Sequence, residues 1–262
     1  MTKQTIRTIK KQKGGEKLTV ITAYDYLFSR LFDGRVDMIL VGDSLGPSFA
    51  GFPDTLPVTL DTMLYHAKAV CKGAPGTFTI FDMPYGTYTT EAMALENALR
   101  AYRETTVDAV KIEGGVQKAQ IIETLTANGV AVMGHIGLLP QSVRGDGGFR
   151  VKGKSDDEIA DLITDARAVE KAGAFAMVIE GVTADAGEAI TNAVGIPTIG
   201  IGAGARTDGQ VLVWSDMLGF FNDFRPKFVR RYMEGDTLVR EALAQYTADV
   251  KSGAFPGEAE SY

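Results

Sequence analysis

The sequence predicts a (β/α)8 TIM barrel, an α/β fold, formed by a single domain over residues 1–262. Eight short apolar runs alternate with helical patterns along nearly the whole chain, whose length is typical of this fold. Acidic residues also follow several of the runs directly. In a barrel the carboxyl ends of all strands meet at one mouth, whereas an open doubly wound sheet would spread these acids along a crevice.

The eight predicted strands are apolar runs bounded by polar or glycine-containing segments. They span residues 18–23, 36–41, 77–82, 107–115, 130–135, 174–180, 197–201 and 210–214. Helices are predicted where apolar residues recur three and four positions apart. They span residues 24–33, 59–72, 90–104, 116–128, 155–172, 184–193 and 235–251. Residues 1–17 are polar and basic and are expected to form an N-terminal arm or cap, while residues 42–57 and 137–153 are expected to be loops.

The composition indicates an ordinary globular protein, with 45% hydrophobic residues and a mean hydropathy of +0.01. A formal charge of −6 argues against nucleic acid or an anionic membrane as a partner, because both require a basic face. No apolar run is long enough to span a bilayer, and the N-terminus lacks an apolar signal core. A single cysteine, Cys71, excludes an internal disulfide and fits a reducing compartment. We therefore expect a cytoplasmic protein.

The residues predicted to carry chemistry lie at the carboxyl ends of the second to sixth strands. They are Asp43, Ser44, Asp82, Lys111, Glu113, His135 and Glu180. Carboxylates gathered at one mouth repel each other unless a cation, a proton or a lysine lies among them. Few His and Cys residues accompany these acids, so the set favours a hard, oxygen-preferring ion, with magnesium as the first choice.

The fourth strand carries two of these residues on one face. Side chains alternate along a strand, so Lys111 and Glu113 share the inward face and Ile112 points outward to the helices. His135, at the end of the fifth strand, is predicted to orient a substrate.

Two glycine-rich segments indicate a function less clearly than the strand-end residues do. Residues 200–205 (GIGAGA) match a dinucleotide-binding pattern, but they follow the seventh strand rather than the first strand of a Rossmann unit. Their glycines are better explained by a close approach of the backbone to a ligand or a loop. Residues 142–153 form either a plain surface loop or a lid that excludes water.

Motifs along the whole chain resemble those of the ketopantoate hydroxymethyltransferase family. They occur at Thr22–Asp25 (TAYD), Val41–Gly46 (VGDSLG), Val58–Leu60 with Tyr65–His66, Asp82–Gly86 (DMPYG), Val110–Gly115 (VKIEGG), Met133–Gly137 (MGHIG), Pro140–Ser142 (PQS), Ile179–Glu180, Pro197–Gly204 (PTIGIGAG) and Asp208–Val213 (DGQVLV).

The resemblance implies a barrel of the phosphoenolpyruvate/pyruvate class, usually assembled as a homodecamer. It implies transfer of a one-carbon unit from 5,10-methylenetetrahydrofolate to 3-methyl-2-oxobutanoate, through a magnesium-stabilised enolate. The product, 2-dehydropantoate, is that of the first step of pantothenate and coenzyme A biosynthesis. The resemblance implies that Asp43 and Asp82 are magnesium ligands and that Glu113 lies beside the ion. It implies that the 2-oxo acid is bound by Asp43, Ser44, Asp82 and Lys111. Glu180 would be the catalytic base.

The chain departs from the family pattern at Pro47 and at Ala205–Thr207 (ART), which both flank the proposed mouth. Two other functions stay open. One is a carbon–carbon lyase or mutase of the same barrel class, but the lyases use a cysteine in a Lys-Lys-Cys-Gly-His loop, and Cys71 lies on a predicted helix instead. The other is a non-catalytic barrel that binds a 2-oxo acid.

Overall fold

The computed structural model describes residues 2–222 and 225–262. The chain divides into two compact units, one that ends at Val213 and one that begins at Trp214. The organisation as a single domain stays a prediction.

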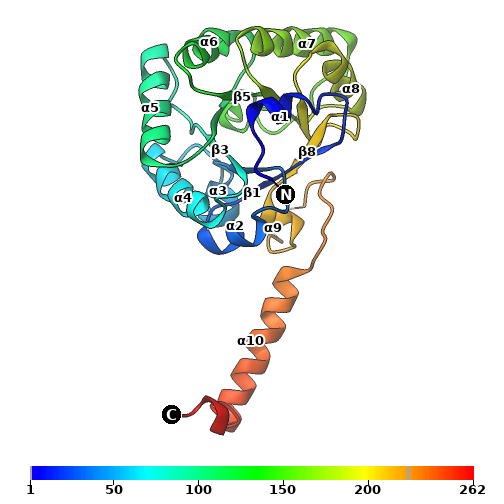
Figure 1. The fold of residues 1–262 in the computed structure, drawn as a ribbon. Helices are drawn as coiled ribbons and strands as arrows, with labels where there is room; N and C mark the ends of the chain where they lie inside the picture. The colour runs from blue at the N-terminus through cyan, green and yellow to red at the C-terminus, as the bar shows by residue number, and fades with distance from the viewer. Residues whose placement is uncertain (1, 223–224) are drawn as a thin grey trace. The chain divides into compact units, whose positions relative to one another are not determined.

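The first unit is a closed barrel of eight parallel strands, which confirms the predicted fold class (Figure 1). Each strand pairs with the next in chain order, and β8 closes the ring by pairing with β1. The strands are β1 (Leu18–Thr22), β2 (Met38–Val41), β3 (Phe78–Asp82), β4 (Ala109–Glu113), β5 (Val132–Gly137), β6 (Ala176–Glu180), β7 (Thr198–Ile201) and β8 (Gly209–Leu212).

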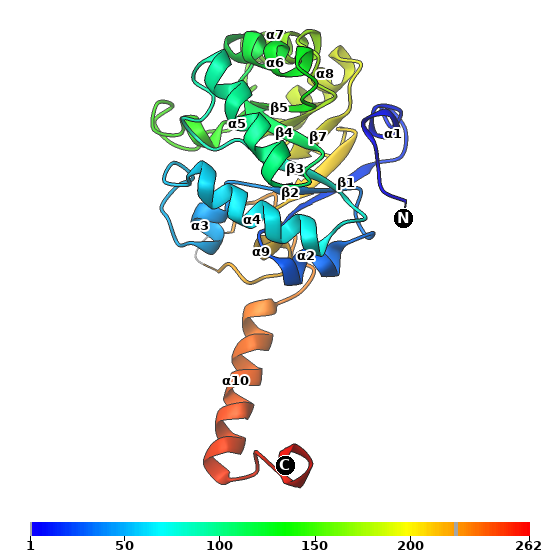
Figure 2. The same cartoon turned by 60° about the vertical axis from the view of Figure 1, so that its left-hand side comes forward.

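The helices that connect the strands lie around the outside of the barrel (Figure 1 and Figure 2). They are α2 (Tyr26–Phe32), α3 (Leu45–Phe49), α4 (Leu60–Gly73), α5 (Glu91–Glu104), α6 (Ala119–Ala127), α7 (Asp156–Lys171) and α8 (Ala184–Ala193), with short 3₁₀ helices η1 (Val116–Lys118) and η2 (Pro140–Ser142). Five of the longer helices, α2, α4, α5, α7 and α8, begin at a Ser, Thr or Asp side chain that accepts a backbone N–H of the first turn.

Several local predictions were wrong. The strand predicted over residues 130–135 begins at Val132 and continues to Gly137, so His135 does not end it. The predicted loop 42–57 contains α3, whose five residues are too few to give a periodic signal. Pro47 lies in its first turn, where no backbone N–H is needed for a helical hydrogen bond. β8 ends at Leu212, so Trp214 begins a short helix, α9 (Trp214–Met217), instead of ending a strand. β4 stops at Glu113 rather than residue 115, since Gly114 turns the chain with φ +126°.

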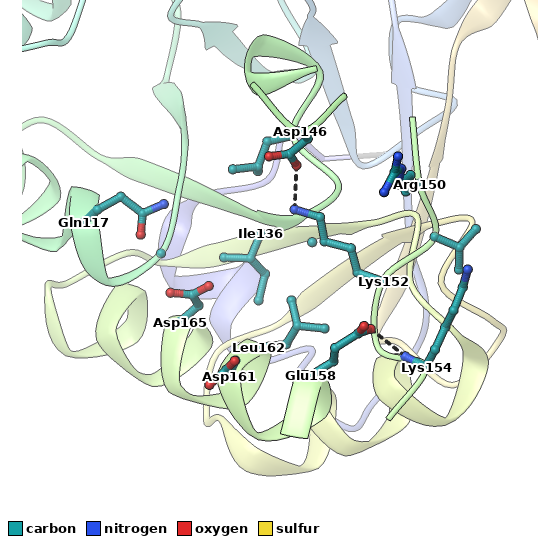
Figure 3. Close-up of a pocket in the computed structure, with 14 residues that line it drawn as sticks. Gln117, Ile136, Asp146, Arg150, Lys152, Lys154, Glu158, Asp161, Leu162 and Asp165 are labelled. Atoms are coloured by element: carbon teal, nitrogen blue, oxygen red, sulfur yellow. Dashed lines mark hydrogen bonds and ion pairs between the residues drawn. The ribbon is translucent and has the colours of Figure 1, made fainter. Parts of the chain in front are cut away.

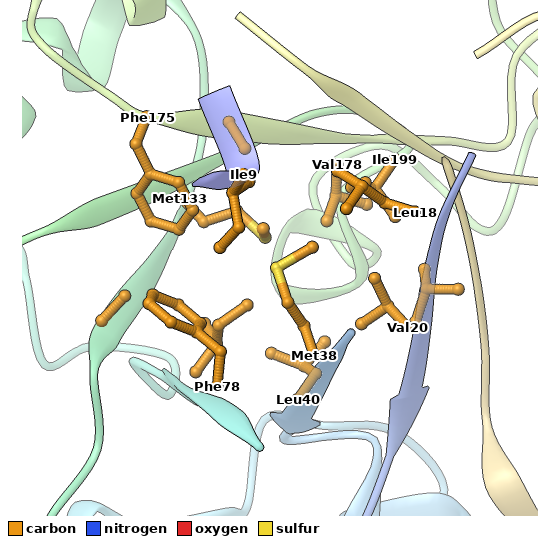
Figure 4. Packing of buried hydrophobic residues seen from close by; sticks show 14 residues of the cluster. Ile9, Leu18, Val20, Met38, Leu40, Phe78, Met133, Phe175, Val178 and Ile199 are labelled. Atoms are coloured by element: carbon orange, nitrogen blue, oxygen red, sulfur yellow. The ribbon is translucent and has the colours of Figure 1, made fainter. Parts of the chain in front are cut away.

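The N-terminal residues cap the barrel, as the prediction of an arm or cap allowed. Helix α1 (Ile6–Lys10) places Ile9 among the apolar side chains at the amino ends of the strands, where it is fully buried (Figure 4). Burial of one such side chain contributes about 1.5–3 kcal/mol. The buried carboxylate of Asp208 also holds this segment, because it accepts bonds of 2.9 Å from Nζ of Lys13 and from the backbone N–H of Gly14.

The second unit contains α9, α10 (Gly235–Ser252) and a 3₁₀ helix, η3 (Glu258–Glu260). Along α10, apolar side chains are exposed at Leu238, Val239, Leu243, Tyr246 and Val250. Within the described residues of the whole chain, no helix has the length and apolar character needed to cross a membrane.

Candidate active site

A cavity of about 100 Å³ opens at the carboxyl ends of the barrel strands. The structure brings together there all seven residues predicted from the sequence. They are Asp43, Ser44, Asp82, Lys111, Glu113, His135 and Glu180. Apolar side chains form part of the remaining wall, including Leu40, Val178, Ile201 and Val211.

Strand register sets the contacts among the charged groups. Asp82 of β3 is paired with Lys111 of β4, and Glu113 of β4 is paired with His135 of β5. Paired residues of adjacent strands point to the same face, here the barrel interior. Nζ of Lys111 therefore lies 2.7 Å from Oδ1 of Asp82 and 3.7 Å from Oε1 of Glu113.

His135 links this cluster to the predicted base, Glu180. Its Nδ1 lies 3.1 Å from Nζ of Lys111 and 3.5 Å from Oε1 of Glu113. Its Nε2 lies 3.3 Å from Oε2 of Glu180, within ion-pair distance but outside hydrogen-bond geometry. The side chain of Glu180 is 21% exposed, compared with 3% for Lys111, so this carboxylate is the one that faces an entering molecule.

Burial and mutual repulsion raise the pKa values of two carboxyl groups. Burial raises the pKa of Asp43 well above its ordinary value, and the charges of Asp82 and Glu113 raise it further. Burial also raises the pKa of Asp82, although the adjacent Lys111 opposes the shift. A buried carboxylate cluster of this kind takes up a cation or a proton.

The remaining charged groups of the cluster are stabilised by their partners. Burial lowers the pKa of Lys111, but the charges of Asp82, Glu113 and Asp43 outweigh burial and leave that pKa above its ordinary value. Burial raises the pKa of Glu113, but Lys111 and His135 outweigh it, so this pKa is lowered. Burial and Lys111 lower the pKa of His135, but Glu113 and Glu180 more than compensate. Lys111 therefore stays protonated and places a positive charge at the centre of the site.

Two neighbours of the predicted residues were missed as site residues. Gln141, on η2, is buried and donates from Nε2 to Oδ2 of Asp43 at 2.8 Å. Tyr24 reaches Oγ of Ser44 through its hydroxyl at 2.8 Å. Both occur in the motifs that resemble the family. Tyr24 directly follows the first predicted strand but was placed in the predicted helix 24–33, and Gln141 lies in the predicted loop 137–153, so neither was proposed as a site residue.

Gly137 allows the turn that carries Gln141 into the site. Its φ is +96°, and a Cβ there would lie 2.3 Å from the backbone oxygen of Glu180. Only glycine combines this backbone conformation with so close an approach of β5 to β6.

The oxygen atoms available in the cluster are of the type that a hard divalent cation prefers as ligands. Asp43, Asp82 and Glu113 offer carboxylate oxygens, and Oδ1 of Asp82 is buried without a directional hydrogen bond, 2.7 Å from Nζ of Lys111. No group of three His, Cys, Asp or Glu residues in residues 2–222 and 225–262 is already arranged in coordination geometry. A cation would therefore join or displace the ammonium of Lys111 among these oxygens.

A larger cavity, of about 560 Å³, lies between β5, α7 and the segment 146–154 (Figure 3). Its charged lining residues are Asp146, Arg150, Lys152, Lys154, Glu158, Asp161 and Asp165. Two of them neutralise each other, because Nζ of Lys152 lies 2.7 Å from Asp146. None of the predicted site residues lines this cavity.

Residues 202–208 connect β7 to β8. Thr207 is fully buried, and its hydroxyl donates to the backbone oxygen of Gly209 at 2.8 Å and accepts from the side chain of Gln210. Arg206 forms an ion pair with Glu188 of α8. The departure from the family pattern at Ala205–Thr207 therefore has structural contacts within this loop and with a neighbouring helix.

Solved structures with the same barrel fold are known. The barrel is similar to phosphoenolpyruvate phosphomutase from Streptomyces platensis subsp. rosaceus, with a TM-score of 0.62, 14% identity and coverage of 95% of this chain and 88% of that one. It is equally similar to 2,3-dimethylmalate lyase, a member of the PEP mutase/isocitrate lyase superfamily, with a TM-score of 0.62, 16% identity and coverage of 98% and 86%. At these identities the likeness shows the fold alone.

Sequence relatives are much closer. The chain is 57% identical over 258 residues to the 3-methyl-2-oxobutanoate hydroxymethyltransferase of Wolinella succinogenes, with 98% of both chains covered. It is 60% identical to the enzyme of the same name from Aliarcobacter butzleri, with 99% and 97% covered. The family model for ketopantoate hydroxymethyltransferase matches residues 3–258. The chain therefore belongs to the ketopantoate hydroxymethyltransferase family.

Proposed function

We propose that the cluster around Lys111 performs the reaction of this family, transfer of a one-carbon unit to 3-methyl-2-oxobutanoate in the first step of pantothenate biosynthesis. The one-carbon donor in the proposal is 5,10-methylenetetrahydrofolate. The supporting observation is a small cavity in which one partly exposed carboxylate, Glu180, faces a buried set of three acids and one lysine. Enolisation of a 2-oxo acid needs a base near C3 and positive charge near its oxygens.

In this proposal Asp43, Asp82 and Glu113 hold magnesium. When bound, magnesium polarises the keto group of the oxo acid and lowers the free energy of negative charge on its oxygens. Lys111 supplies a second, permanent positive charge against the carboxylate or the keto oxygen. Ser44, held by Tyr24, donates to the oxo acid, and His135 orients both Lys111 and Glu180.

Glu180 takes the proton from C3, and the electron pair of that C–H bond forms the enolate. The enolate carbon attacks the methylene carbon of the folate, which is bound to two folate nitrogens. The new carbon–carbon bond forms as one of these carbon–nitrogen bonds breaks, and water then displaces the second nitrogen. The two nitrogens take up the proton from C3 and one proton of the water. One water molecule supplies the hydroxyl oxygen, so the products are 2-dehydropantoate and tetrahydrofolate. General-base catalysis of this kind contributes about 10²- to 10⁴-fold.

One experiment tests ion, substrate and base together. The protein is mixed with 3-methyl-2-oxobutanoate and MgCl₂ in deuterium oxide, and loss of the C3 proton is followed by NMR without folate. We expect exchange that depends on magnesium. Binding of the oxo acid without any exchange would contradict the proposal and favour a binding barrel.

The lyase alternative finds less support. Cys71 lies on α4 and is buried, and burial raises the pKa of its thiol, which opposes formation of a thiolate nucleophile. The cytoplasmic location and the homodecamer remain proposals from family membership.

A further inference from the structure

We infer that Gln141 is a positioning residue of the active site, which fixes the carboxylates of Asp43 and Glu113 in the orientation that binds a divalent cation. The inference rests on the proposed function, since the ion is part of that proposal. Gln141 is 6% exposed and lies on η2, directly after the turn at Gly137.

The hydrogen bonds of Gln141 determine the orientation of its side-chain amide. Nε2 donates to Oδ2 of Asp43 at 2.8 Å and to the backbone oxygen of Met83 at 2.9 Å. Oε1 accepts from the hydroxyl of Tyr88. A flipped amide would place Oε1 against a carboxylate and a carbonyl, and its NH₂ group against Tyr88, so only one orientation satisfies all three partners.

The backbone of Gln141 completes the arrangement. Its N–H donates to Oε2 of Glu113 at 3.1 Å. A single residue therefore ties the end of β2 to the end of β4 and occupies one oxygen of each carboxylate. Gln141 does not contact the other oxygens, Oδ1 of Asp43 and Oε1 of Glu113. Oε1 lies 3.7 Å from Nζ of Lys111 and 3.5 Å from Nδ1 of His135, so a cation that binds it would take the place of these groups.

Tyr88 holds the side chain of Gln141 on the side away from Asp43. It is 5% exposed, and Nζ of Lys118 lies over its ring at 5.1 Å from the centroid. Because the phenol is enclosed, its hydroxyl has a fixed direction and donates to Oε1 of Gln141. Groups that hold metal ligands from behind change metal affinity by about 10- to 100-fold when they are removed.

The test uses Gln141→Met, which keeps the side-chain volume and the backbone N–H but removes the amide. Ser142→Ala is the matched control, because Ser142 lies on the same turn with an exposed side chain. MnCl₂ is titrated into each protein and free Mn²⁺ is measured by EPR, with MgCl₂ as competitor. Thermal unfolding without metal is recorded in parallel, and a crystal structure of Gln141→Met locates the carboxylate of Asp43.

We expect Gln141→Met to bind Mn²⁺ about 10- to 100-fold more weakly than the wild type, with Ser142→Ala unchanged and the carboxylate of Asp43 rotated. An Mn²⁺ affinity within threefold of the wild type would overturn the inference. A lower unfolding temperature in that variant would then show that Gln141 contributes to packing alone. A wild-type protein that binds neither Mn²⁺ nor Mg²⁺ would contradict the proposed ion instead. In that case an unmoved Asp43 in the Gln141→Met structure would overturn the inference, and a rotated one would support the positioning.

Discussion

The ammonium group of Lys111 lies 2.7 Å from Oδ1 of Asp82, and both side chains are only 3% exposed. The contact follows from the register of β3 and β4, which pairs these two residues on the inner face of the barrel. Lys111 is therefore the ammonium group that stabilises the buried carboxylates of the cluster.

Replacement of Lys111 by Met should destabilise the metal-free protein by about 3–5 kcal/mol, because it leaves buried carboxylates without their partner. Urea unfolding in EDTA measures this change. Lys68→Met is the control, since Lys68 pairs with Glu104 at an exposed site, where such pairs contribute about 0–1 kcal/mol. Equal effects of the two substitutions would contradict the central role of Lys111.

Glu180→Gln should reduce proton exchange at C3 of 3-methyl-2-oxobutanoate by about 10²- to 10⁴-fold, because the amide does not accept the proton. NMR in deuterium oxide measures the exchange, and calorimetry should show that the oxo acid still binds. Glu188→Gln, which alters a surface ion pair with Arg206, should exchange at the wild-type rate. Exchange retained in Glu180→Gln would remove this residue from the role of base.

Asp82→Asn should weaken binding of both magnesium and the oxo acid, since an amide lacks the charge that the ion requires. Titration calorimetry with MgCl₂, and then with the oxo acid, measures both effects. Asp61→Asn, at an 82% exposed side chain, is the control. An unchanged magnesium titration would argue against Asp82 as a ligand.

Asp208→Asn should lower the free energy of unfolding at pH 7 by about 1.5–3 kcal/mol, because Asp208 accepts hydrogen bonds from Lys13, Gly14 and Thr198 as a charged group. Burial raises the pKa of Asp208, but these bonds outweigh it and leave the pKa below its ordinary value of 3.8.

The sign of the pH effect follows from that lowered pKa. The contribution of Asp208 is fully present above its ordinary value of 3.8 and is lost as the pH falls through the lower, folded-state value. Urea unfolding between pH 7 and pH 3 should therefore show that the difference between wild type and Asp208→Asn shrinks only at the acidic end. A constant difference across this range would contradict the assignment.

The sequence alone determined the barrel and the members of the charged cluster. The strands are covered on both faces, so their apolar runs are continuous and visible without an alignment. Carboxylates at strand ends must converge when the strands close into a barrel, so the sequence predicts that Asp43, Asp82, Glu113 and Glu180 belong to one site.

Only the tertiary structure decided how these groups meet. Register pairs Lys111 with Asp82, and the burial of both residues follows from the closure of the barrel. Gln141 was recognisable as part of a motif, but its role depends on hydrogen bonds to residues 28 and 98 positions away in the chain. No local pattern encodes such contacts. The sequence around a polar residue in a turn looks the same whether its side chain is exposed to solvent or buried against a carboxylate.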